Sequence, residues 1–298
     1  MNIDIQNPSL MSKVLISGAV TIISVSATTP LERVKVLLQN QSEMVNQDKL
    51  SQPYKDAQDF INQMIDQNGV SFFWRGNTIL CIHAVLSQLT RMALKGKIMT
   101  LIPIRKIDSY ALNFTKNVLI GTLAGTITIC LFYSLIFAYT RLASDIGINS
   151  ENEFNGAIDV YRKTLSKNGI CGLYRGFGIT CVGHVLYTAL TYCLIDFLKP
   201  IFVKQNFDVF SFYLSISLIG VAVTYPLDTI RRRMMMTVGV EPTYDSSIDC
   251  FNKVTNNEGY CVLFQGLDMS LVKVKLSSLL KFGLEALFKK IFDLSPLI

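Results

Sequence analysis

The sequence predicts an all-α membrane protein with six transmembrane helices in three pseudo-symmetric repeats, plus three short amphipathic helices on one side of the membrane. Half of the 298 residues are hydrophobic and only 17% are charged, whereas soluble domains usually carry about a quarter charged residues. One pattern recurs three times along the chain, and six long apolar segments separate its copies. The excess apolar surface therefore needs lipid, and the repeats predict an internally symmetric fold.

The repeat is defined by an aromatic residue and two glycines in fixed register. The aromatic residue lies 22 residues before the second glycine of each copy, and the first glycine lies 7 residues before it. We expect one structural domain built from repeats at 1–107, 108–205 and 206–298. The copies begin at Tyr54, Phe154 and Tyr244, and their glycine pairs are Gly69/Gly76, Gly169/Gly176 and Gly259/Gly266.

A short amphipathic helix is predicted between the aromatic residue and the first glycine of each copy. Apolar residues recur there at helical spacing, and a glycine can end such a helix in a left-handed conformation. An amphipathic helix between two long apolar segments suits a membrane surface. The apolar positions are Ala57, Phe60, Ile61, Met64 and Ile65 in the first copy, Ala157, Ile158, Tyr161 and Leu165 in the second, and Ile248, Phe251 and Val254 in the third.

The six apolar segments are each long enough to cross about 30 Å of hydrocarbon with some tilt. Small residues interrupt them, among them Gly121 and Gly125, and allow helices to pack closely. We place the segments at Leu10–Gln39, Thr78–Ile102, Leu112–Asp145, Phe177–Val203, Asp208–Met236 and Ser270–Phe292.

The first and fifth segments share the motif Pro-x-acid-x-x-base, at Pro30–Lys35 and Pro226–Arg231. The acids are Glu32 and Asp228, and each base lies three residues on, on the same helix face. Proline should kink both helices, and the third should bend less at Ser134, where serine replaces proline. Ionisable residues at membrane depth usually face an interior cavity and pair with one another, so three such helices could close a ring of ion pairs between repeats.

These motifs resemble the signature of the mitochondrial carrier family, and most closely that of the ADP/ATP carriers. The resemblance rests on residues 30–39, 73–77, 140–143, 174–176 and the Arg-Arg-Arg-Met-Met-Met run at 231–236. It implies a multi-pass protein of the mitochondrial inner membrane, with the short helices on the matrix side and a central cavity that opens alternately to either side. It also implies cardiolipin, bound at helix N-termini by Arg75, Gly76, Arg175, Gly176 and Gly266, while Gln265 lacks the aligned cation.

The chain departs from the family pattern at both gates. In the second repeat Ile136 and Tyr139 replace the acid and the base of the matrix gate. The charged residues that remain at this gate are Glu32, Lys35, Asp228 and Arg231. Of these, only Asp228 and Lys35 are expected to pair between repeats. Glu32 and Arg231 would then need other partners or water. The cytoplasmic gate retains Asp196, Lys199 and Glu285, whereas Gly96, Met99 and Phe288 stand at its other positions, with Lys289 displaced by one.

The positions that correspond to substrate contacts are also altered. The ADP/ATP carriers have arginine where this chain has His83 and Lys273, and lysine where it has Val25. Arginine grips phosphate bidentately, whereas histidine is mostly neutral near pH 7. The full set of expected contact positions is His83, Gly183, His184, Tyr187, Arg232 and Lys273.

Several other functions find no support in the sequence. It contains no nucleophile–base pair, phosphate-binding loop or dinucleotide motif, so an enzyme is not expected, and no cofactor other than bound cardiolipin. No run of Lys and Arg indicates nucleic acid. The seven cysteines form no metal-binding spacing, and Cys81 and His83 lie about 200° apart on a helix, which disfavours a metal site.

Two functions remain open at this point. The depleted gates favour a transport-impaired carrier that serves as a structural subunit of a larger respiratory assembly in the inner membrane. The alternative is an active exchanger of nucleotides or another anion, of the ADP/ATP-carrier type, supported by the Arg-Met run, by Tyr187 and by the remaining basic residues.

Overall fold

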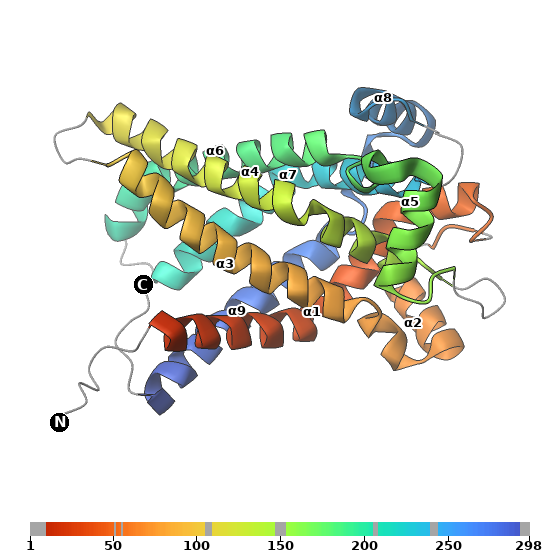
Figure 1. The fold of residues 1–298 in the computed structure, drawn as a ribbon, viewed down its shortest axis with the longest axis horizontal. Coiled ribbons are helices and arrows are strands. Elements are labelled where there is room, and N and C mark those ends of the chain that lie inside the picture. The colour runs from red at the N-terminus through yellow and green to blue at the C-terminus, as the bar shows by residue number, and fades with distance from the viewer. Residues whose placement is uncertain are drawn as a thin grey trace.

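The computed structural model describes residues 10–50, 52–54, 56–104, 109–146, 153–204, 208–238 and 244–292. Six long helices run roughly along the long axis of the molecule, and three short helices gather at one end (Figure 1). The long helices are α1 (Leu10–Asn46), α3 (Asn77–Leu101), α4 (Tyr110–Ala143), α6 (Phe177–Lys204), α7 (Val209–Met236) and α9 (Leu267–Phe292). The short helices are α2 (Ala57–Asn68), α5 (Ala157–Leu173) and α8 (Ser247–Glu258).

The long helices form a closed ring, because each contacts the next in the order α1, α3, α4, α6, α7, α9, and α9 packs against α1. Among the described residues four of the six, namely α1, α4, α6 and α7, contain stretches long and apolar enough to cross a membrane. Helices α3 and α9, with 25 and 26 residues, are also long enough to cross a membrane, and they carry the charged residues Arg91 and Lys273. Those charges face the interior of the ring, as described below, so the predicted six-helix membrane bundle is confirmed.

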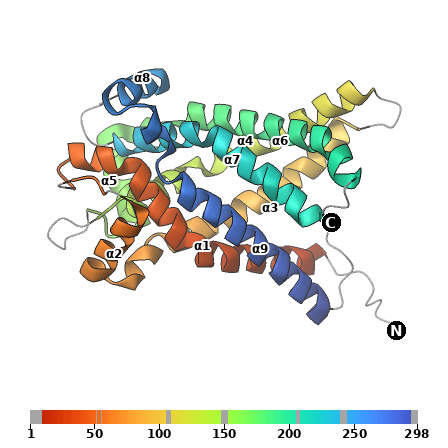
Figure 2. The same ribbon diagram turned by 180° about the vertical axis from the view of Figure 1, so that it is seen from behind.

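Helices α1 and α7 contain Pro30 and Pro226 within continuous helix. Helix α1 changes direction along its length, and α9 runs close beside it (Figure 2). Proline removes one backbone hydrogen bond from the helix ladder, which makes such a bend less costly. The smaller bend expected at Ser134 stays a prediction.

The short helices follow the predicted glycine register. Helices α2 and α8 end at Gly69 and Gly259, which have φ of 74° and 86°. In α5 the equivalent Gly169 has φ of 62°, and helix resumes beyond it to Leu173. The apolar face of these helices is divided: Phe60, Met64 and Val254 are buried against the bundle, whereas Ile158 and Ile248 are 85% and 74% exposed. The exposed residues suit contact with the membrane.

The second glycine of each repeat shows the pseudo-threefold symmetry most clearly. Gly76, Gly176 and Gly266 have φ between 78° and 87°, a region that favours glycine. A Cβ atom added to Gly76 would lie 3.1 Å from the Tyr139 ring. A Cβ atom on Gly176 would lie 3.2 Å from the Arg231 carbonyl oxygen, and one on Gly266 would lie 3.3 Å from the Lys35 carbonyl oxygen. Each glycine therefore packs against the same position of the next repeat.

Burial is concentrated where the short helices lie. The largest apolar cluster there joins Val36 of α1, Phe137 and Tyr139 of α4, and Met235 of α7, all with no exposed surface. Helices α1, α4 and α7 also contact one another. This end of the bundle is thus packed shut.

Candidate substrate cavity and gate

A central cavity of about 820 Å³ lies inside the ring of helices. All six expected substrate-contact positions line it, although they come from four different helices. The lining also includes seven Lys and Arg residues against only two acids. The contact positions are His83, Gly183, His184, Tyr187, Arg232 and Lys273.

Helical periodicity explains why the charged residues of α3 and α9 face the cavity. His83, Ser87, Arg91 and Lys95 follow one another at four-residue spacing on α3, and all four line the cavity. On α9 Lys273, Ser277 and Lys281 repeat the pattern. Residues four apart share one helix face, so each helix turns one polar stripe inward.

Glycines on α4 and α7 lie against two of the side chains that are expected to contact the substrate. A Cβ atom at Gly125 of α4 would lie 1.8 Å from His184 Nε2, and one at Gly220 of α7 would lie 2.8 Å from the Tyr187 ring. Both aromatic side chains therefore lie directly on helix backbone. This is the close packing expected near Gly121 and Gly125.

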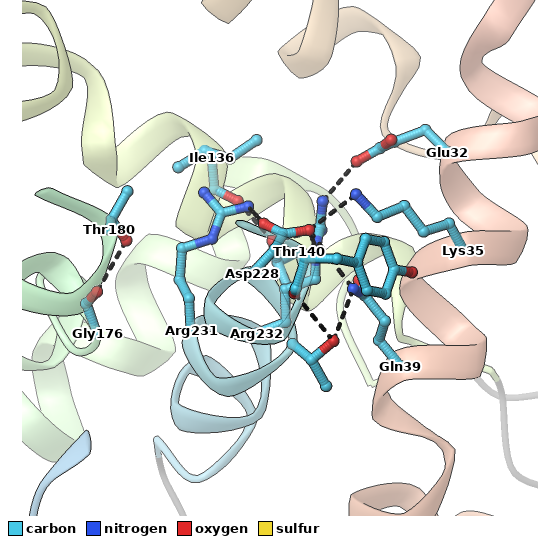
Figure 3. A network of polar contacts seen from close by, with 12 residues as sticks. Glu32, Lys35, Gln39, Ile136, Thr140, Gly176, Thr180, Asp228, Arg231 and Arg232 are labelled. Carbon is cyan, nitrogen blue, oxygen red and sulfur yellow. Dashed lines mark hydrogen bonds and ion pairs between the residues drawn. The ribbon is translucent and has the colours of Figure 1, made fainter. Parts of the chain in front are cut away.

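The floor of the cavity is a charged network centred on Asp228 (Figure 3). Lys35 Nζ lies 2.8 Å from Asp228 Oδ2, so the one ion pair expected between repeats is present. Arg231 pairs with the other carboxylate oxygen of Asp228. Arg232 lies between two carboxylates, 2.5 Å from Glu32 Oε1 and 3.3 Å from Asp228 Oδ2.

Glu32 has two cationic partners, which the register of the motif did not anticipate. Besides Arg232 it binds Lys273, whose Nζ lies 2.8 Å from Glu32 Oε2. Arg232 and Lys273 are thus the other partners that Glu32 was expected to need in place of an acid–base pair within the motif. Arg232 follows the motif by one residue and Lys273 comes from α9, so neither is found by aligning equivalent motif positions. Buried carboxylates stripped of water need such partners.

The second repeat contributes buried, uncharged side chains to the gate instead of an ion pair. Tyr139 is fully buried against Gly76, and within the described residues its hydroxyl has no hydrogen-bond partner. Thr140 accepts a long hydrogen bond of 3.5 Å from Arg232 and donates to the Ile136 carbonyl. The gate is thus asymmetric: charges from repeats one and three, with an apolar wall from repeat two.

The opposite end of the bundle looks different. Within the described part of the chain, no ion pair joins Asp196, Lys199 or Glu285 to another repeat. The Lys289 side chain lies outside the described residues. Met92 and Lys95, farther along α3 than His83, are exposed. The cavity is accessible from this end and closed at the end that carries the short helices.

The two arginines expected at lipid sites are engaged with the neighbouring repeat. Arg75 donates to Asp145 Oδ2 and to the Phe154 carbonyl, both at 2.6 Å. Arg175 donates to the Tyr244 carbonyl at 2.5 Å. Their guanidinium groups therefore link repeat one to repeat two and repeat two to repeat three.

The third link of this ring uses amides. Gln265 accepts a hydrogen bond of 3.2 Å from Gln41, and Gln41 in turn accepts one of 3.1 Å from the Tyr54 backbone. Gln41 and Asp145 stand at equivalent positions after the gate motif. The link between repeats one and two pairs Arg75 with the carboxylate of Asp145, whereas the link between repeats three and one pairs Gln265 with the amide of Gln41. Neither Asp145 nor Gln41 was predicted as a site residue, although their equivalent positions in the repeats could have identified them.

A second charged cluster lies beyond the floor, next to α8. Arg233 binds Glu258 bidentately, and the Tyr244 hydroxyl donates to Glu43. Burial by itself would raise the pKa of the Glu258 carboxyl, but hydrogen bonds from Arg233 and Ser42 outweigh it and lower the pKa. This cluster ties α1 to the third repeat.

Comparison with known proteins agrees with this geometry. The profile of the mitochondrial carrier protein family matches residues 6–106, 110–206 and 214–295. The chain therefore belongs to the mitochondrial carrier family. It is a multi-pass protein of the mitochondrial inner membrane, not an enzyme, and its short helices lie on the matrix side.

Within the family, its relatives include several ADP,ATP carrier proteins. The chain is 37% identical to the ADP,ATP carrier protein of Chlamydomonas reinhardtii over 279 residues, which is 90% of each chain. It is 39% identical to ADP,ATP carrier protein 3 of Saccharomyces cerevisiae over 269 residues, 87% of each chain. Identity reaches 40% with ADP,ATP carrier protein 1 of Gossypium hirsutum over 270 residues, 87% of this chain and 69% of the relative.

Proposed function

We propose that this carrier exchanges adenine nucleotides, or a closely related phosphorylated anion, across the inner membrane. The observation that carries the proposal is a positively charged cavity that is closed at the matrix side by ion pairs between repeats one and three. Tyr187 adds an aromatic face beside the cationic lining. The names of the relatives point to the same substrates.

The other expectation, a transport-impaired structural subunit, rested on a matrix gate too poor in ion pairs to stay closed. Arg232 and Lys273 supply the missing cations to Glu32, so that argument loses its basis. The exchanger is therefore the better-supported function.

Anion binding and gate opening share one residue in this arrangement. Lys273 lines the cavity and also holds Glu32. A phosphate group that attracts Lys273 would weaken its pair with Glu32, and a ligand shifts a conformational equilibrium only through such differential contacts. Substrate binding would then favour opening towards the matrix.

The test is exchange by the purified chain in liposomes. Vesicles loaded with ADP should take up labelled ATP, vesicles without internal nucleotide should not, and labelled adenosine should not enter. Absence of exchange with ADP, ATP and inorganic phosphate, in protein that still unfolds cooperatively on heating, would overturn the proposal.

We further propose that phospholipid phosphates, such as those of cardiolipin, bind at the N-termini of α3 and α6. Free backbone N–H groups at a helix start favour anions, and α3 and α6 begin directly after Gly76 and Gly176. Since Arg75 and Arg175 bind the neighbouring repeat, the backbone would carry most of the binding. Native mass spectrometry should detect retained cardiolipin, and loss of retention in Gly76→Val but not in Gly96→Ala would support these sites.

A further inference from the structure

The cations of the cavity fall into two groups. Four of them, Lys35, Arg231, Arg232 and Lys273, are paired with the two acids at the floor. The other three, Arg91, Lys95 and Lys281, also line the cavity, yet within the described residues none forms an ion pair. The positive charge available to a ligand therefore lies above the floor, nearer the open end.

Arg91 and Lys281 stand at equivalent positions of two repeats. Arg91 lies 15 residues after Gly76, and Lys281 lies 15 residues after Gly266. Each is eight residues beyond the cavity residue His83 or Lys273, which is about two turns or 12 Å along the helix. Repeat two has Thr191 at this position, so the pair is contributed by α3 and α9 from either side of α1.

Both cations line the same cavity as Tyr187, and both side chains are exposed. Ionisable residues inside a membrane bundle are rare and mark substrate paths, and a cleft lined with one sign of charge between low-dielectric walls concentrates ligands of the other sign.

The level nearer the floor offers less to a phosphate group. His83 stands at this level where the ADP/ATP carriers have arginine, and histidine carries no permanent charge at neutral pH. Lys273 is held by Glu32 at 2.8 Å. Neither residue presents a permanent, unpaired charge, whereas Arg91 presents a planar fork of donors that fits phosphate oxygens in pairs.

We propose that Arg91 and Lys281 form the principal phosphate-binding pair of this cavity, for a ligand with two or more adjacent phosphate groups. The inference deepens the proposed exchange function and rests on it for the identity of the substrate. Arg91 binds one phosphate bidentately, Lys281 neutralises the next, and Lys95, one turn farther out, guides the anion inward. The ligand then reaches Lys273 only by moving deeper, which places initial binding and gate release at different levels.

The test uses inorganic pyrophosphate as the probe and the purified full chain in detergent. Isothermal titration calorimetry should show binding that weakens at least about tenfold in Arg91→Gln/Lys281→Gln, since the loss of even one hydrogen bond to a charged group has about this effect. The control is Lys97→Gln/Lys275→Gln, which removes the same charge from the same two helices at exposed positions outside the cavity lining. It should bind pyrophosphate as the unmodified chain does.

Unchanged binding in the Arg91/Lys281 variant, or no binding to the unmodified chain, would overturn the site. Exchange in liposomes separates this failure from that of the proposed function. Exchange of ADP for ATP with equal KM in both double variants would leave the function standing and remove the site. Pyrophosphate binding that depends on Arg91 and Lys281, without any nucleotide exchange, would leave the site and remove the function.

Discussion

Both ends of the bundle carry charged residues, but only those at the end with the short helices form ion pairs between repeats within the described part of the chain. At the matrix side Glu32 and Asp228 each contact two or three cations, and the surrounding side chains are buried. Towards the other end, Arg91, Lys281 and Lys199 have no ion pair among the described residues. The stability of the closed gate therefore depends on which charged residues lie close together in space. Arg232 and Lys273, both outside the motif, pair with Glu32 and compensate for the charges that repeat two lacks.

The largest effect should come from Asp228, which holds three cations at once. Asp228→Asn leaves Lys35, Arg231 and Arg232 short of a counter-charge, and breaking a buried ion pair costs about 3–5 kcal/mol. The thermal unfolding temperature in detergent should fall clearly. Asp66→Asn, at an exposed position of α2, is the matched control and should change it little. An equal effect of the two substitutions would contradict the network.

The ring that links the repeats allows a sharper test. Arg75→Gln leaves the buried Asp145 carboxylate without its ion-pair partner and with only the backbone N–H groups of residues 153 and 154, and it should cost about 2 kcal/mol. Adding Asp145→Gln recreates the amide pair seen between Gln265 and Gln41, so the double variant should recover part of the loss. The measurement is a double-mutant cycle of unfolding free energies. Simple additivity of the two single effects would show that Arg75 and Asp145 are not coupled.

A smaller effect is expected from pH at the Arg233–Glu258 pair. The pKa of Glu258 is lowered in the folded state from its ordinary value of 4.5. Its contribution to stability is therefore fully present above about pH 4.5 and is lost as pH falls through the lower folded value. Unfolding temperatures measured from pH 6 to pH 3 should decline less steeply in Glu258→Gln. Identical pH profiles for both proteins would argue against this contribution.

The smallest effect should be found at the open end. Lys199→Gln removes a charge that is exposed and has no ion pair within the described residues, so the unfolding free energy should change by no more than about 0.5 kcal/mol. The contrast with Asp228→Asn is the prediction. A loss comparable to that of Asp228→Asn would show that this end is also closed by a charged gate.

Much of the fold could be derived from the sequence because its signals are local and periodic. The six long helices begin and end within a few residues of the expected segments, apart from the C-terminal end of α1, which runs on to Asn46. The glycine register located α2, α5 and α8, since glycine alone adopts the required positive φ without strain. The inward stripe on α3 likewise follows from residues four apart.

The sequence by itself determined the family, the repeats and the pair between Lys35 and Asp228, all of which depend on equivalent positions in register. Only the tertiary structure decided which cation serves Glu32, because Lys273 lies 241 residues away on another helix. The same holds for Arg91 and Lys281, because only the structure shows that the two acids of the cavity lining pair with other cations. Electrostatic partnership is a property of three-dimensional proximity and burial, and a linear motif records neither.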